Sequence, residues 1–303
     1  MSDASPQNFQ PHGVYAASVT PLNADLTPDL GALTTHSRWL LANGCDGLGV
    51  LGTTGEANSI ALQDRLRIIA HLARELPAER LMPGVGTPAL ADTEMLIRAC
   101  LDNGVTNVLC LPPFFYKPLN DAQIEAYFIA LLERVATDRL RLYLYHIPQF
   151  SGVGFSVAVI AALRRRFGDV VAGAKDSSGD FFNMRRMAEE LPGFRVFAGS
   201  EQFLGDILAV GGAGCISATT NLTSRQAQRV YQERSATAQA ALTPLRLAIQ
   251  AKPLVPAIKG MLGKMTGVAA LGRMLPPHLP LSDDEITALE KALLAEKFDP
   301  PVF

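Results

Sequence analysis

The sequence carries little net charge and no basic patch. Its 303 residues hold 27 Lys and Arg against 29 Asp and Glu, a formal net charge of −2. Proteins that bind nucleic acids or anionic membranes through charge need a clustered excess of Lys and Arg, which is missing here. We therefore expect a small-molecule partner, with neither nucleic acid nor membrane as a partner. With 48% hydrophobic residues, the chain can bury one large core.

Cysteine is scarce and scattered. The four cysteines are Cys45, Cys100, Cys110 and Cys215. They form no C-x-x-C pair, and no histidine lies near them at metal-ligand spacing. The pattern predicts reduced, mostly buried thiols in a cytoplasmic protein, and no metal site.

Long apolar runs are also absent. No stretch approaches the roughly 20 apolar residues that a membrane-spanning helix needs. Residues 1–13 (MSDASPQNFQPHG) are polar and lack the basic and apolar regions of a secretory signal. These absences predict a soluble, cytoplasmic protein.

Short apolar runs alternate with amphipathic stretches along most of the chain, which is typical of parallel strands joined by crossover helices. The predicted strands are residues 14–20, 47–51, 81–85, 107–111, 141–145, 170–175, 194–198 and 214–217. The predicted helices are residues 29–42, 62–76, 92–102, 122–136, 156–167, 182–191, 201–210 and 224–232. Eight such units without a break in the rhythm favour an α/β fold of the closed (β/α)8 (TIM) barrel type over a doubly wound sheet.

The ends of the helices and of the barrel can also be read from the sequence. Pro28 is predicted in the first turn of helix 29–42, and Gly44, Gly104 and Gly168 follow predicted helix ends, where a positive φ is common. The rhythm changes after Ser235. We expect an N-terminal tail at 1–12, a catalytic barrel at 13–235, and a C-terminal helical extension of three helices at 236–303.

Lys175 is the most informative residue. It closes the apolar run 170–174 (VVAGA), and the C-terminal ends of barrel strands face one shared mouth where chemistry is found. Burial there disfavours the charged ammonium and favours a neutral amine that can attack a ketone as a nucleophile. The imine so formed is an electron sink for chemistry at C3 and C4 of a 2-oxo acid. Alternatively, Lys175 simply leaves the sheet and extends into solvent.

Polar groups on two other strand ends converge on the same mouth. Tyr145 ends strand 141–145, so its phenol can pass protons to groups near Lys175. Thr53 and Thr54 lie between Gly52 and Gly55, where hydroxyl and N–H groups suit a carboxylate. Taken singly, these would be a core tyrosine and a tight turn, and their coincidence at strand ends favours a site.

Three motifs together resemble the dihydrodipicolinate synthase and N-acetylneuraminate lyase family: residues 52–56 (GTTGE), 145–148 (YHIP) and the segment that ends at Lys175. Residues 112–116 (PPFFY), 199–201 (GSE) and 259–262 (KGML) extend the resemblance, which runs from about Gly13 into the C-terminal helices.

The resemblance implies a role for each of these positions. Lys175 would form a Schiff base with pyruvate, Tyr145 would shuttle protons, and Thr53 would relay them. We expect the substrate to be bound by Thr54 and Gly52 near the carboxylate, by Ile216, and, toward the second substrate, by the polar groups of Ser177, Ser200, Glu201 and Ser217. The family fold is a (β/α)8 barrel with a C-terminal helical extension. The family uses neither metal nor organic cofactor and is commonly tetrameric, so we expect a homo-oligomer, either dimer or tetramer.

Three departures from the synthases bear on the substrate. The segment 149–152 (QFSG) has no arginine where the synthases bind a second carboxylate, which argues against aspartate semialdehyde. Phe115 stands where a relay tyrosine is often found, with Tyr116 beside it, and His146 replaces an asparagine. We therefore expect cleavage or dehydration of a deoxy or hydroxy 2-oxo acid, such as 2-keto-3-deoxygluconate or 4-hydroxy-2-oxoglutarate. Dihydrodipicolinate synthase activity is the alternative.

Two further readings belong to other classes. Residues 47–52 (GLGVLG) match the dinucleotide fingerprint G-x-G-x-x-G, but the glycines lie inside a predicted strand and a loop follows, so the context excludes it. A barrel that binds a 2-oxo acid without turning it over is the non-enzymatic alternative. Phe115 favours this alternative, whereas Lys175 and Tyr145 count against it.

Overall fold

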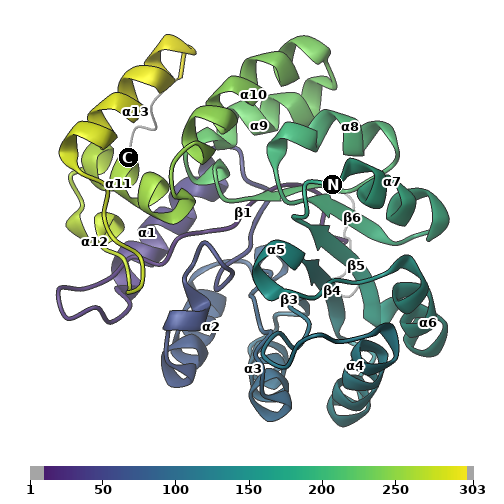
Figure 1. Cartoon of the computed structure of the whole chain (residues 1–303). Helices are drawn as coiled ribbons and strands as arrows, with labels where there is room; N and C mark the ends of the chain where they lie inside the picture. Colours follow the sequence, from purple (N-terminus) through teal and green to yellow (C-terminus); the bar gives the residue numbers. More distant parts are fainter. Residues whose placement is uncertain (1–9, 299–303) are drawn as a thin grey trace.

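The structure, a computed structural model, describes residues 10–298. One parallel sheet forms its centre, with strands in the order β2-β1-β7-β6-β5-β4-β3 (Figure 1). The strands are β1 (Gly13–Ala16), β2 (Gly47–Leu48), β3 (Asn107–Cys110), β4 (Arg141–His146), β5 (Val171–Asp176), β6 (Arg195–Ala198) and β7 (Gly214–Ser217). The prediction of a (β/α)8 barrel with C-terminal helices is confirmed.

The eighth predicted strand, 81–85, closes the barrel without being a regular strand. Leu81 bridges to Leu48 in β2, and Gly84 bridges to Leu109 in β3. The N–H of Gly84 donates to the Val50 oxygen at 2.8 Å, and the Val85 N–H donates to the Leu109 oxygen at 2.9 Å. Pro83 has no N–H to contribute to a ladder, so pairing is interrupted. β2 is also shorter than predicted, and the backbone turns left-handed at Leu51, with φ of 56°.

Helices surround the sheet and cover its outer face (Figure 1). They are α1 (Leu30–Ala42), α2 (Leu62–Glu75), α3 (Leu90–Asp102), α4 (Asp121–Val135), α6 (Val157–Phe167), α7 (Phe181–Glu190), α8 (Leu204–Ala209) and α9 (Thr220–Glu233). Short helical turns at η2 (Ala57–Ser59), η3 (Ala78–Arg80), α5 (Pro148–Ser151), η4 (Gly168–Val170) and η5 (Glu201–Phe203) were not predicted as separate elements.

Local chemistry sets the helix ends. Asp29 caps α1 by accepting from the Ala32 N–H, so Pro28 lies before the cap and not in the first turn as predicted. The predicted positive φ is confirmed at Gly44, Gly104 and Gly168. α9 begins four residues earlier than predicted because it merges two helices across a kink at Thr223.

The strands alternate between two apolar layers. In β1, Val14 and Ala16 face the outer layer under the helices, whereas Tyr15 faces the barrel interior. The interior layer also holds Tyr143 and Tyr145 of β4. A Cβ at Gly47 would lie 2.2 Å from the Tyr15 ring, so that glycine makes room for the aromatic filling. Side chains that point inward near the strand ends therefore enter one enclosed space.

The four cysteines are free and buried, as predicted. Burial raises the pKa of the Cys110 thiol to about 12, although Arg65 opposes this shift. Among residues 10–298, no helix is long and apolar enough to cross a bilayer. The same residues contain no group of three or more His, Cys, Asp or Glu placed to hold a metal ion.

The C-terminal helices pack beside the barrel over a second apolar cluster (Figure 1). They are α10 (Ala236–Gln250), α11 (Leu254–Thr266), α12 (Ala269–Gly272) and α13 (Asp283–Ala295). Three helices were expected, and the short α12 is additional. The division between barrel and extension at residues 235 and 236 stays a prediction. Residues 1–9 of the predicted N-terminal tail and residues 299–303 lie outside the described part of the chain.

A buried ion pair joins this extension to the barrel. Lys259 of α11 donates to the carboxylate of Glu56 in the loop after β2, and both side chains are fully buried. Glu56 also accepts from the Leu275 N–H at 2.6 Å and adopts a left-handed backbone, with φ of 58°. Burial lowers the pKa of Lys259, although the facing carboxylate opposes the shift. The pair thus fixes the conformation of the loop that carries Thr53 and Thr54.

Breaking this pair should cost much more stability than breaking an exposed one on the same helix. We expect Lys259→Met to lower the free energy of unfolding by about 3–5 kcal/mol, because Glu56 is left buried without its partner. The control is Lys264→Met, which removes an exposed ion pair with Glu290 and should cost about 0–1 kcal/mol. Urea denaturation measures both variants. Equal losses would contradict the role assigned to the buried pair.

Candidate active site

Strand register places Lys175 beside Tyr145. In the parallel ladder, Tyr145 of β4 is paired with Lys175 of β5, and Lys175 with Phe197 of β6. Side chains alternate across a strand, so residues paired in register project to the same side. The barrel therefore brings a tyrosine, a lysine and a phenylalanine to one level of its interior.

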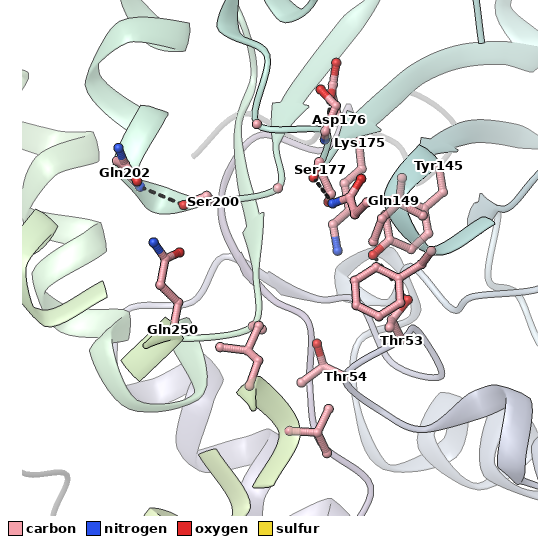
Figure 2. A pocket seen from close by; sticks show the side chains of 18 of the residues that line it. Thr53, Thr54, Tyr145, Gln149, Lys175, Asp176, Ser177, Ser200, Gln202 and Gln250 are labelled. Atoms are coloured by element: carbon pink, nitrogen blue, oxygen red, sulfur yellow. Dashed lines mark hydrogen bonds between the residues drawn. The ribbon is translucent and has the colours of Figure 1, made fainter. Parts of the chain in front are cut away.

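The Lys175 side chain is buried and lies against an aromatic face. Only 4% of the residue is exposed, and Nζ lies 4.4 Å from the centroid of the Tyr145 ring. Figure 2 shows the amine pointing into the cavity. The amine does not extend into solvent, which was the alternative reading of a lysine at a strand end.

Tyr145 connects the lysine to the loop after β2. Its hydroxyl lies 3.4 Å from Thr53 Oγ1, and either oxygen can donate. Burial by itself raises the pKa of the Tyr145 phenol, but the charge of Lys175 and the hydrogen bond with Thr53 outweigh it. The resulting pKa is lower than that of an ordinary tyrosine. Such a phenol can give up and take back a proton more readily than a free tyrosine.

These three residues line one cavity of about 640 Å³. The barrel contributes Thr53, Thr54, Tyr145, Ile147, Gln149, Phe150, Lys175, Asp176, Ser177, Ser178, Gly179, Met184, Gly199, Ser200, Gln202, Phe203 and Ala218. The C-terminal extension and its links contribute Arg246, Gln250, Pro253, Leu254, Val255, Pro256 and His278. A cavity of this size suits a small organic acid.

Four other predicted site residues lie behind the cavity wall. Gly52 borders a much smaller cavity beside Tyr145, and Ile216 belongs to the apolar filling of the barrel. Ser217 and Glu201 are fully buried and do not line the main cavity. Thr54, Ser177 and Ser200 do line it, so the structure gathers six of the ten predicted residues there.

Glu201 anchors a network of hydroxyl groups. Its carboxylate accepts hydrogen bonds from Ser217, Thr219 and Thr223, and it lies 3.6 Å from Nη1 of Arg246 on α10. A buried carboxylate needs such partners to offset its lost hydration. Glu201 and Ser217 therefore hold Arg246 in place from behind.

Several polar residues of the cavity were not predicted. Gln149, Asp176 and Gln202 lie next to strand ends that the sequence places at the barrel mouth. Their closeness to these strand ends is a signal from which they could have been predicted. Asp176 is fully buried and accepts from the Ser178 N–H at 2.8 Å and from Asn183 Nδ2 at 2.8 Å. Arg246 and Gln250 are four residues apart on one face of α10, but no pattern in the sequence indicates that this face meets the barrel mouth.

Phe115, Tyr116 and His146, where the sequence departs from the synthases, lie outside the main cavity. Phe115 and Tyr116 pack against each other, with ring centroids 5.2 Å apart. They are 69% and 80% exposed, and neither lines the cavity. His146 accepts from the Phe155 N–H at 2.9 Å through Nδ1. Burial lowers the pKa of His146, while Asp176 and Asp180 oppose the shift. His146 thus holds the loop after β4.

The fold and the placement of this cavity at the strand ends define a (β/α)8-barrel enzyme. A model of the dihydrodipicolinate synthetase family matches residues 10–296. The chain belongs to this family, and its function is that of a lyase of the family.

Individual relatives agree with this assignment. An uncharacterized DapA-like lyase of Chloroflexus aurantiacus is 34% identical, over 93% of this chain and 96% of its own. A 4-hydroxy-tetrahydrodipicolinate synthase of Listeria welshimeri is 28% identical, over 92% and 97%. The crystal structure of dihydrodipicolinate synthase from Agrobacterium tumefaciens superposes with a TM-score of 0.86 at 27% identity, covering 94% of this chain and 99% of that one.

The lowered pKa of Tyr145 can be tested by titration. We expect tyrosinate absorbance to appear at lower pH in the parent protein than in Tyr145→Phe, because the Lys175 charge stabilises the phenolate. In Lys175→Met, burial then dominates and the Tyr145 signal should move to higher pH. Tyr143→Phe on the same strand is the control, since burial raises the pKa of Tyr143. A parent signal that Tyr145→Phe leaves unchanged would contradict the assignment.

Proposed function

We propose that the protein is a Schiff-base lyase that cleaves or dehydrates a deoxy or hydroxy 2-oxo acid. The observation that carries the proposal is the buried amine of Lys175, in register with Tyr145 on the wall of a cavity of about 640 Å³. Membership in a family of lyases supports the reaction class.

The proposed reaction begins at C2 of the substrate. Lys175 first gives its ammonium proton to water, and the free amine then adds to the ketone; loss of water gives a protonated imine. For cleavage, the C4 hydroxyl loses its proton to Tyr145, the C3–C4 bond breaks, and its electron pair moves toward the imine nitrogen to form an enamine. The aldehyde leaves. Protonation at C3 and attack by water then release pyruvate and the free amine.

Dehydration uses the same imine. Tyr145 takes a proton from C3 to form the enamine and returns it to the C4 hydroxyl, which leaves as water. Attack by water on the resulting conjugated imine then releases the unsaturated 2-oxo acid and the free amine of Lys175. Thr53, 3.4 Å from the phenol, relays the proton toward the cavity. Thr54 holds the substrate carboxylate in this proposal, and Ser177 and Ser200 bind oxygens of the second half of the substrate. Two reaction outcomes thus need only one set of residues.

The second candidate is condensation of pyruvate with aspartate semialdehyde, since a relative at 28% identity is named 4-hydroxy-tetrahydrodipicolinate synthase. Phe150 counts against it. This apolar side chain lines the cavity two residues after Pro148, in the segment where the resemblance to the synthases calls for an arginine. Aspartate semialdehyde with pyruvate therefore belongs in the substrate panel beside 2-keto-3-deoxygluconate and 4-hydroxy-2-oxoglutarate.

Borohydride trapping tests the Schiff base directly. We expect pyruvate and borohydride to give one reduced adduct at Lys175, located by peptide mass spectrometry, and no adduct in Lys175→Ala. The matched control is Lys291→Ala, which removes an exposed lysine on α13 and should leave trapping unchanged. Absence of any adduct in the parent, or an unchanged adduct in Lys175→Ala, would refute the mechanism.

Tyr145→Phe should separate imine formation from bond cleavage. We expect turnover of the best substrate of the panel to fall about 10²- to 10⁴-fold, because a positioned proton donor and acceptor is lost. The pyruvate adduct should still form at Lys175 on long incubation. Pyruvate release measured with a coupled dehydrogenase gives the rate. Turnover equal to that of the parent would exclude Tyr145 as the proton shuttle.

A further inference from the structure

Arg246 is a cavity residue to which the proposed reaction gives no role. It lies on α10, is only 8% exposed, and lines the same cavity as Lys175. Its guanidinium is held on two edges. Nε donates to Gln250 Oε1 at 3.0 Å, and Nη1 donates to Thr219 Oγ1 at 3.0 Å and to Ser217 Oγ at 3.2 Å.

The third edge of the guanidinium is open. Within residues 10–298, Arg246 Nη2 donates no hydrogen bond to the protein. Nη2 is also not among the buried nitrogen and oxygen atoms that lack a partner. It therefore has accessible surface, and the cavity is the space that Arg246 borders. An arginine fixed in this way presents a preformed donor to a ligand in the cavity.

Arg246 belongs to the wall across from the reacting groups. Figure 2 shows Gln250, Gln202 and Ser200 on one side of the cavity, with Lys175, Tyr145 and Thr53 on the other. Arg246 is hydrogen-bonded to Gln250 and so belongs to the first group. A substrate whose C2 is bound to Lys175 would extend its far end toward this wall. The wall is rich in donors, whereas the buried oxygens of Glu201 are already engaged by three hydroxyls.

We propose that Arg246 binds a carboxylate at the far end of the substrate, so that the substrate is a 2-oxo dicarboxylic acid. Guanidinium and carboxylate form charge-assisted hydrogen bonds that a terminal hydroxyl or methyl group does not match. This inference rests on the proposed function, since it assumes that C2 is held at Lys175. Arg246, which lies on α10, also provides the cationic group that segment 149–152 lacks.

The test uses pairs of 2-oxo acids that differ only at the far end. 2-Oxoglutarate is compared with 2-oxopentanoate, and 2-oxoadipate with 2-oxohexanoate, by the concentration that half-saturates borohydride trapping at Lys175. In the parent we expect the dicarboxylate of at least one pair to half-saturate at about 10- to 100-fold lower concentration, as expected for a charge-assisted contact. Arg246→Met should abolish this preference, and Arg246→Lys should retain part of it.

Three controls keep the outcomes distinct. Pyruvate ends at C3 and carries no second carboxylate, so its trapping should be the same in the parent and in both Arg246 variants. Arg246→Lys keeps a cation beside Glu201 if Arg246→Met fails to fold. Arg229→Met removes an exposed ion pair on α9 and should leave the preference unchanged.

Each failure has a separate meaning. A parent without preference for either dicarboxylate, or an Arg246→Met variant that keeps the preference, overturns the inference while pyruvate trapping still supports the proposed function. An Arg246→Met variant that loses pyruvate trapping together with the preference assigns Arg246 a structural role and also overturns the inference. A parent that forms no pyruvate adduct overturns the proposed function, and the inference with it.

Discussion

The buried pairing of Lys259 with Glu56 is the interaction on which the rest of the site depends. It ties α11 to the loop after β2, and that loop carries Thr53 and Thr54. The same extension supplies Arg246, Gln250 and His278 to the opposite wall of the cavity. The ion pair therefore joins the loop that carries Thr53 and Thr54 to the extension that supplies residues of the opposite wall. A charge so deeply buried is tolerable only because its partner is equally fixed.

Parallel register is the second constraint. Because Tyr145, Lys175 and Phe197 share one level of the sheet, the phenol and the amine meet without a flexible loop to position them. Sites built on strands hold their geometry better than sites built on loops. The apolar interior of the barrel, with Tyr15 and Ile216, is buried. The barrel thus holds the phenol and the amine side by side against a buried apolar layer.

The sequence predicted the lysine, the tyrosine and the threonines because each stands at the end of a short apolar run. It did not predict Arg246. Segment 149–152 has no arginine, yet a guanidinium lines the cavity from α10. Glu201 was expected to contact substrate and instead holds that guanidinium from behind the wall. A buried carboxylate and a ligand-binding one look alike in a sequence, and no local pattern marks Arg246 as facing the barrel mouth.

What the sequence determined by itself is the repeating βα architecture and which polar side chains stand at the strand ends. Strand and helix periodicities are local, and all parallel strands present their carboxyl ends on one side, so positions near Lys175 could be inferred without coordinates. Only the tertiary structure decided which face of α10 meets the cavity and how residues 81–85 close the barrel around Pro83. Those features depend on packing between segments far apart in the chain, and neither periodicity nor motif spacing encodes such packing.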